Sequence, residues 1–185
     1  MLVLGCDPSL TAYGWSIVDR SVLPPKVLAT GCIQTKKDAK KSHMYAADQD
    51  AQRVVMLARG LEFAVSMLDR LASEQAPAGR MTMPVRVVCE APAGSRHAVS
   101  AKALGQSLGV TLGVLVARGY GCRFVQAGEV KLRMASSMGA SKGNVAEGVA
   151  RLTGWYSAAK TKPEREAESD ATAVALTLTL EELNS

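Results

Sequence analysis

The sequence predicts an α/β domain built around a mixed central sheet. Three short apolar segments, spaced about ten residues apart and separated by turn residues, open the chain. Apolar segments with helical period then alternate with further short apolar runs. The expected order is strand, strand, strand, helix, strand, helix, strand, helix, with an antiparallel meander first and parallel strands added to it.

The first strands are expected at residues 1–9, 13–20 and 26–35, with the turn segments SLTA and SVLPP between them. A change of period marks a long helix over residues 46–73. Its apolar residues recur at steps of three and four and form one stripe: Val54, Leu57, Ala58, Leu61, Ala64, Val65, Leu68 and Leu71.

The second half continues the alternation of strands and helices. A short apolar run ends at Glu90, much as the first strand ends at Asp7. The remaining elements are expected as a strand at 85–89, a helix at 98–118, a strand at 122–127, two shorter helices within 128–153, and a closing helix within 164–183. Without an internal repeat or a linker, residues 1–185 are predicted to form a single domain.

Composition favours a soluble globular protein. The chain has 185 residues and is 48% hydrophobic, which is enough to bury one core. Its apolar stretches are interrupted by Gly, Arg or Ser before the roughly 20 residues of a membrane span. We find no secretory signal and expect a cytoplasmic location. The four cysteines lack CxxC spacing and are expected to be free thiols.

Three acidic residues stand where an apolar element delivers a carboxylate to its end. Asp7 and Glu90 end strands, and Asp170 lies near the start of the last helix, one turn after Glu166. If the first and fourth strands are neighbours, Asp7 and Glu90 meet at one edge and repel each other unless a cation holds them. Oxygen ligands of this kind suit Mg²⁺ or Mn²⁺, and a pair of such ions cleaves phosphodiesters with an activated water.

Each acid also has a plainer interpretation. Asp7 in Asp-Pro-Ser is good turn chemistry, and acids near residue 170 favour a helix N-terminus. Glu90 has no such role, so it is the hardest of the three to dismiss. From spacing alone, both interpretations stay open.

Positive charge gathers in the second half of the chain. Residues 80–170 hold 13 Lys and Arg against 7 Asp and Glu, a balance of +6 in a protein whose net charge is +5. This asymmetry favours a polyanionic partner such as nucleic acid.

Several segments, taken in order along nearly the whole chain, resemble RuvC-type Holliday junction resolvases. The aspartate of the first strand and its following proline resemble that family's first strand, and the later acids fall in similar surroundings. The matching segments are LGCDPSLTAYGWSIV, VVCEAP, SAKALGQSLGVTLGVL, VQAGEVKLRMASSMGASKGNVAEGVARLTG and ESDATAVAL.

The resemblance implies an RNase H-like fold, a homodimer, and cleavage of a four-way DNA junction with two Mg²⁺ or Mn²⁺ ions. It places Asp7, Glu90 and Asp170 on the family's metal-binding acids. The family's fourth acidic position, three residues before the last aspartate, is Ala167 here. Glu166 shares a helix face with Asp170 and is the expected substitute. Glu168 would replace it only if the helix began at Ser169.

The resemblance also assigns DNA contacts. Lys131 and Lys142 match lysines that the family uses against DNA phosphate, and the neighbouring basic residues are further candidates: Arg96, Lys102 and Arg133. Such contacts confer affinity without reading sequence. The loop after Glu90 lacks the aromatic that such resolvases often carry, and only His97 could stack there.

Other functions remain open. The chain could cleave other branched DNA or RNA with the same fold, or bind junctions without cleaving them because Ala167 replaces an acid. An actin-like ATPase or sugar kinase is disfavoured, because those proteins need two phosphate loops and roughly twice this length. Trp15, Phe63 and Phe124 fall in apolar patterns and are expected in the core rather than in a stacking ladder. Any motor partner is unknown from the sequence.

Overall fold

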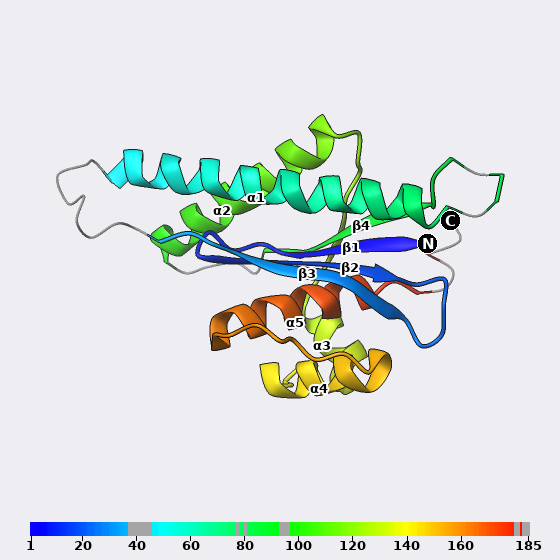
Figure 1. Ribbon diagram of the computed structural model, residues 1–185. Coiled ribbons are helices and arrows are strands. Elements are labelled where there is room, and N and C mark those ends of the chain that lie inside the picture. The colour runs from blue at the N-terminus through cyan, green and yellow to red at the C-terminus, as the bar shows by residue number, and fades with distance from the viewer. Residues whose placement is uncertain (37–45, 77, 80, 93–96, 180–181, 183–185) are drawn as a thin grey trace.

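A central sheet lies between two layers of helices in the computed structural model, which describes residues 1–36, 46–76, 78–79, 81–92, 97–179 and 182. Helices α1 and α2 cover one face, and α3, α4 and α5 cover the other (Figure 1). The elements are β1 (Leu2–Asp7), β2 (Ala12–Asp19), β3 (Lys26–Gln34), α1 (Ala46–Glu74), β4 (Val85–Glu90), α2 (Ala98–Ala117), β5 (Arg123–Val125), α3 (Ala127–Ala135), α4 (Lys142–Thr153) and α5 (Lys162–Leu176).

The sheet has five strands in the order β3-β2-β1-β4-β5. β1, β2 and β3 form the predicted antiparallel meander, and β4 and β5 add in parallel. In the β1–β4 pair, Cys6 lies opposite Cys89. The next residues, Asp7 and Glu90, therefore end two adjacent parallel strands at the same edge, as the mixed-sheet prediction required. This edge is called the acidic edge below.

Each face of the sheet has its own core. Toward α1 and α2, strand residues such as Leu4 and Ile17 pack against the predicted α1 stripe, of which Leu57, Leu61 and Leu68 are almost fully buried. Toward the other helices, Val3 and Val88 pack against residues of α3, α4 and α5. The sheet is thus buried on both faces, as parallel strands require.

Helix α5 approaches the sheet closely because two strand residues are glycines. A Cβ on Gly5 would collide with the backbone of Ala171, and one on Gly14 would collide with the carbonyl of Ala167. Small residues on both surfaces therefore let the α5 backbone lie directly on β1 and β2. Thr172 Oγ1 bonds Ser16 Oγ at 2.9 Å and adds a polar link. This contact determines which α5 residues reach the acidic edge.

The boundaries of α5 differ from the predicted helix. It begins at Lys162, where Thr161 caps the helix and forms a capping box with Glu164, and Pro163 occupies the first turn. It ends at Leu176 rather than near residue 183, because Thr177 caps it by donating both its N–H and its Oγ1 hydroxyl to the carbonyl of Val174. Leu178 then packs into the core. The start at Lys162 matters for the site.

Helix α2 corrects one expectation from the sequence. By length and composition, Ala98–Ala117 is apolar enough to cross a membrane, although the interruptions along the chain were expected to exclude this. Single Gly and Ser residues did not lower its mean hydropathy enough. α2 packs along α1 and buries Ser107, Thr111, Val114 and Leu115, while Val99 and Val116 are exposed.

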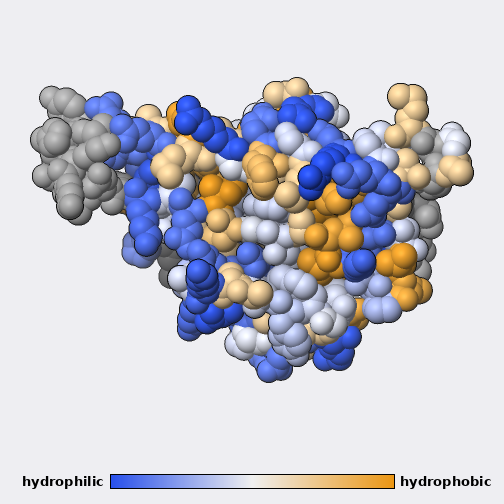
Figure 2. Space-filling view, viewed as in Figure 1, coloured by the Kyte–Doolittle hydropathy of each residue, from blue (hydrophilic) through white to orange (hydrophobic). Residues whose placement is uncertain are grey.

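The aromatic residues are divided between core and surface. Trp15 is buried as expected, but Phe63 and Phe124 are substantially exposed, so their assignment to the core was wrong. Phe63 packs its edge on the Trp15 ring, with the ring centroids 6.3 Å apart. Figure 2 shows only small separate hydrophobic areas on its face, in the band between α1 and α5. All four cysteines are free, and Cys6 and Cys89 are buried.

Candidate active site

Three acids from three elements line one cavity at the acidic edge. Asp7 comes from the end of β1, Glu90 from the end of β4, and Asp170 from the third turn of α5. The cavity has a volume of about 250 Å³ and is closed by α3 and α4, which contribute Lys131 and Lys142. We call it the acid cavity. The alternative in which Asp7 serves only its turn leaves the meeting of the three acids unexplained.

Burial and mutual repulsion disfavour the charged forms of these acids. Burial, reinforced by the charges of Glu90 and Asp170, raises the pKa of Asp7 from 3.8 to about 7. Burial and the Asp170 charge also raise the pKa of Glu90, and burial raises the pKa of Asp170. Three carboxylates held in this way store an unfavourable interaction that a bound cation would relieve. Perturbed acids in a cavity are typical of functional sites.

Lys142 places one positive charge beside these acids. Its Nζ donates a hydrogen bond to Asp170 Oδ2 at 2.6 Å. Burial opposes the charged form of Lys142, but the bond to Asp170 and the charges of Asp170, Asp7 and Glu166 together outweigh burial and raise its pKa. The charge of Lys142 in turn offsets part of the rise in the pKa values of Asp7, Glu90 and Asp170. The charge of Lys131 offsets part of the rise for Glu90 and Asp170. The cavity is therefore a mixed cluster of three acids and two lysines.

The chemistry of the donor set fits a hard divalent cation. Three carboxylates provide oxygen ligands, which Mg²⁺ and Mn²⁺ prefer, and the cavity leaves room for water and a phosphate. Within the described part of the chain, however, no three His, Cys, Asp or Glu side chains are gathered closely enough to ligate one ion. The ammonium of Lys142 is bonded to one oxygen of Asp170, so Lys142 and a cation would compete for that carboxylate.

The two candidates for the fourth acid lie on different sides of α5. Glu166 shares a face with Asp170, and its Oε2 lies 3.7 Å from Lys142 Nζ, but it does not line the acid cavity. Glu168 accepts a hydrogen bond from Ser157 Oγ at 2.5 Å and lines a separate cavity with Cys32. Because α5 begins at Lys162, Glu168 points away from Asp170. Ala167 is buried against Gly14.

The predicted DNA-binding residues are divided between two ends of the molecule. Lys131 and Lys142 line the acid cavity. Lys102, near the start of α2, pairs with Asp50 at 2.9 Å. Arg133 lies elsewhere: it pairs with Glu129 and lines an open cavity with Arg20, which follows β2 at the opposite end of the sheet. Arg96 falls outside the described residues, and His97 is an exposed residue at the start of α2.

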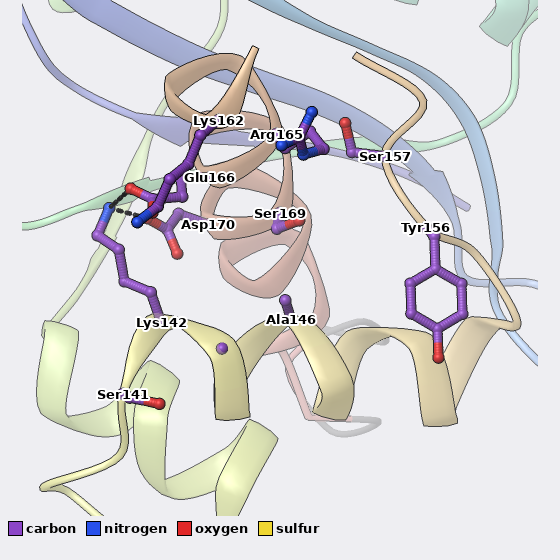
Figure 3. A pocket seen from close by; sticks show the side chains of 11 residues that line it. Ser141, Lys142, Ala146, Tyr156, Ser157, Lys162, Arg165, Glu166, Ser169 and Asp170 are labelled. Atoms are coloured by element: carbon purple, nitrogen blue, oxygen red, sulfur yellow. Dashed lines mark hydrogen bonds and ion pairs between the residues drawn. The ribbon is translucent and has the colours of Figure 1, made fainter. Parts of the chain in front are cut away.

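A second cavity begins where the acid cavity ends. It measures about 490 Å³ and lies between α4, α5 and the segment at 154–161 that connects them. Lys142, Glu166 and Asp170 lie at one end, and Tyr156 lies at the other (Figure 3). We call it the Tyr156 groove. The sequence analysis did not identify Tyr156, although the segment GWYS contained one signal. Tyr156 is a polar aromatic residue between Trp155, which packs inward, and Ser157, which donates a hydrogen bond to α5.

Comparisons with known proteins agree with this architecture. No family model matches the chain. The crossover junction endodeoxyribonuclease RuvC of Rickettsia akari (strain Hartford) is 35% identical over 57 residues, which are 30% of this chain and 36% of that protein. The aligned part therefore spans little more than a third of that relative.

Two solved structures match over most of the chain. Thermus thermophilus RuvC in complex with a Holliday junction substrate is 22% identical and has a TM-score of 0.68, with 96% of this chain and 92% of that chain covered. A second T. thermophilus RuvC structure is 23% identical and has a TM-score of 0.67 at the same coverage. The chain therefore has the RuvC fold, and the resemblance to RuvC-type resolvases predicted from its sequence is confirmed.

Proposed function

We propose that this chain is a metal-dependent endonuclease that resolves four-way (Holliday) DNA junctions by symmetric phosphodiester hydrolysis. One observation carries the proposal: Asp7, Glu90 and Asp170 converge with Lys131 and Lys142 on a single cavity, at one edge of a RuvC fold. A site for hydrolysis of a phosphodiester needs acids to hold a cation and bases to hold a phosphate, and this cavity contains both.

Asp7, Glu90 and Asp170 would hold Mg²⁺, or Mn²⁺ in its place, with two ions per site. Glu166 is the proposed fourth acid, because it alone of the two candidate glutamates faces Lys142 and Asp170. When bound, such ions activate a water and stabilise the leaving oxygen. The raised pKa values of the acids support this assignment, since a divalent cation would favour the charged forms that burial disfavours.

The lysines of the cavity act on the other reactant. The ammonium of Lys142 lies 2.6 Å from Asp170, and a DNA phosphate offers it a second anionic partner. Lys131 lines the opposite wall, on α3. Together they would orient the scissile phosphate over the acids and stabilise the charge that develops on it. Lys142 would thus leave Asp170 and bind the DNA phosphate when metal and DNA bind.

DNA beyond the cavity would lie across the acidic edge. Lys102 is 57% exposed in its side chain and is one proposed contact. Arg96 stays a prediction from the sequence, since it lies outside the described residues. Arg133 is the weakest of the proposed contacts, because it lies with Arg20 at the far end of the sheet. Phosphate contacts of this kind predict binding that weakens steeply with salt.

Symmetric cleavage requires two active sites, and α2 offers the surface for a dimer. Most of this apolar helix is not buried within the chain, and Val99 and Val116 are 79% and 71% exposed. A large exposed apolar surface favours a partner. We propose a second copy of this chain, paired through the side of α2 that faces away from α1. The cytoplasmic location stays a prediction from the sequence.

A cleavage-inactive junction-binding protein is the second candidate. It is favoured by Ala167, which brings no carboxylate to the cavity, and by the engagement of Glu166 with two lysines, Lys142 and Lys162, at 3.7 Å each. The two candidates differ in one measurable property, which is cleavage in the presence of metal.

The test incubates the purified protein with end-labelled four-way junction, linear duplex and RNA–DNA hybrid, each with Mg²⁺, Mn²⁺ or EDTA. Paired, symmetric cuts on the junction alone, absent in EDTA, would support resolution. Cleavage of the hybrid or of the linear duplex would support the same chemistry on another substrate. Junction binding without cleavage in either metal would overturn the enzymatic proposal and leave the second candidate.

A further inference from the structure

The Tyr156 groove has the size and lining of a nucleotide site. Its volume of about 490 Å³ lies within the roughly 300 to 1,000 Å³ of small-ligand pockets. Its walls are the N-terminal halves of α4 and α5 and part of the connecting segment at 154–161. Figure 3 shows Ala146 on the floor, with Lys142 and Lys162 on one side and Tyr156 on the other. A small floor residue leaves the middle of the groove open.

Tyr156 is held as an exposed aromatic surface. The residue is 72% exposed, which is unusual for an aromatic residue that serves only packing. Its neighbours are anchored: Trp155 packs against the core beneath the sheet, and Ser157 donates a hydrogen bond to Glu168 on α5. The chain is thus fastened to the domain on both sides of Tyr156. This anchoring keeps Tyr156 at one end of the groove, where a base could stack on its exposed ring.

Cationic side chains stand at the end of the groove nearest the acids. Lys162 is 80% exposed in its side chain and pairs with Glu166 at 3.7 Å, a distance that leaves the ammonium available to a second anion. Lys142 pairs with the same glutamate from the other side. The guanidinium of Arg165 is occupied, since its Nη1 donates to the carbonyls of Ala159 and Lys160 and steadies the connecting segment. Lys162 is therefore the cation most available to a phosphate.

Lys142 connects the groove to the acid cavity, because it lines both. A strand whose scissile phosphate lies over Asp7, Glu90 and Asp170 must pass Lys142 to reach the groove. The next phosphate then lies near Lys162, and the attached base reaches toward Tyr156. A paired base could not do this, since its face is covered by its neighbours in the duplex.

We propose that the Tyr156 groove binds one unpaired nucleotide next to the scissile phosphate, with its base stacked on Tyr156 and its phosphate on Lys162. The inference rests on the proposed endonuclease function and adds a substrate contact to it. The groove would then favour DNA with an unpaired nucleotide beside the cut, as occurs at a branch point.

The test places 5-iodouracil, which crosslinks to nearby aromatic side chains under ultraviolet light, on either side of the cut position in a four-way junction. The wild-type protein is irradiated with this DNA in EDTA, and the crosslinked peptide is identified by mass spectrometry. A crosslink to Tyr156 from one of these positions is expected. Crosslinks confined to other residues would overturn the proposal, and this readout needs no variant to fold.

Variants then measure what the contact is worth. Tyr156→Ala should weaken junction binding roughly 5- to 100-fold, the range for loss of one stacked base. Tyr156→Phe keeps the ring and should stay within about twofold of wild type. Phe63→Ala, an exposed aromatic on the opposite layer at 59% exposure, is the matched control and should leave binding unchanged. Lys162→Ala should reduce the slope of log affinity against log salt by about one.

The outcomes separate this inference from the proposed function. If the wild-type protein cleaves junctions but Tyr156→Ala binds and cleaves them equally well, the groove proposal fails alone. If the wild-type protein binds without cleaving, the endonuclease proposal fails, while the crosslink still decides whether the groove holds a base.

Discussion

Lys142 lines both the acid cavity and the Tyr156 groove, yet the two sites are built in different ways. The acid cavity lies at the ends of two buried strands and one closely packed helix, so its carboxylates are buried and their pKa values are raised. The groove lies between two helix starts and a connecting segment, and its side chains are largely exposed. Burial creates reactivity in the first, and exposure leaves surface for binding in the second.

This difference indicates a division of labour. Substitutions in the acid cavity should change the rate of cleavage far more than the affinity for DNA. Substitutions in the groove should change affinity first. Lys142 and Asp170 line both cavities. As the shared cation, Lys142 should affect both cleavage and affinity, and it can therefore break the comparison most directly.

The largest effect is expected for Asp7→Asn. The amide keeps the size of the side chain but removes one charged ligand from the cavity, so cleavage with Mg²⁺ should fall by about 10³-fold or more. Junction affinity in EDTA should stay within about threefold of wild type, because Asp7 faces the cavity and not the DNA surface. Gel-shift and cleavage assays on the same preparation measure both. Cleavage at the wild-type rate would remove Asp7 from the proposed metal site.

Lys142→Met should lower cleavage by about 100-fold, because a cation at the scissile phosphate is lost. The same change should tighten Mn²⁺ binding, since the ion no longer competes with an ammonium 2.6 Å from Asp170. Calorimetric titration with Mn²⁺ measures the second effect. Lys102→Met removes a lysine that lies outside both cavities and serves as the matched control for the Mn²⁺ titration alone. Weaker Mn²⁺ binding by Lys142→Met would contradict the competition inferred here.

Stability should depend on pH through the acid cavity. The pKa of Asp7 is raised from 3.8 to about 7, so between these values the folded state binds more protons than the unfolded state. The free energy of unfolding in EDTA should therefore fall as pH rises through this range, and should be about 2 kcal/mol lower at pH 8 than at pH 5. Urea unfolding at both pH values measures this.

Asp7→Asn tests the assignment of that pH dependence to one group. The variant should lose most of the difference between the two pH values and be more stable than wild type at pH 8 without metal. Glu90 and Asp170, whose pKa values are raised as well, should leave a smaller slope of the same sign. An unchanged slope in the variant would assign the effect to other residues.

The smallest effects are expected on α5 outside the acid cavity. Glu166→Gln should reduce cleavage by about tenfold or less, because Glu166 must leave two lysines before it can reach an ion. Glu168→Gln should leave cleavage nearly unchanged, since its carboxylate bonds Ser157 and faces away. Parallel cleavage assays rank the two. A larger loss for Glu168→Gln would reverse the assignment of the fourth acid.

Much of the fold followed from local patterns. The alternation of strands and the period of the long helix predicted β1, β2, β3 and α1, because both depend on which residues must face a core. Boundaries were less certain where capping decides them. Thr161, Pro163 and Glu164 start α5 before the point that would have brought Glu168 toward Asp170. The exposure of Phe63 and of much of α2 was not predicted, because an apolar sequence pattern does not show which of the apolar side chains are left exposed to solvent.

By itself, the sequence singled out the three acids as candidates, because a carboxylate at the end of an apolar strand such as Glu90 has no simpler role, and the resemblance to RuvC-type resolvases pointed to the same residues. Only the tertiary structure decided where their side chains lie. Because α5 packs closely on Gly5 and Gly14, Asp170 lines the acid cavity and Glu166 lies outside it. The packing of α4 places Lys142 between the two cavities. These placements depend on helix-to-sheet packing distances, which arise from contacts between residues far apart along the chain.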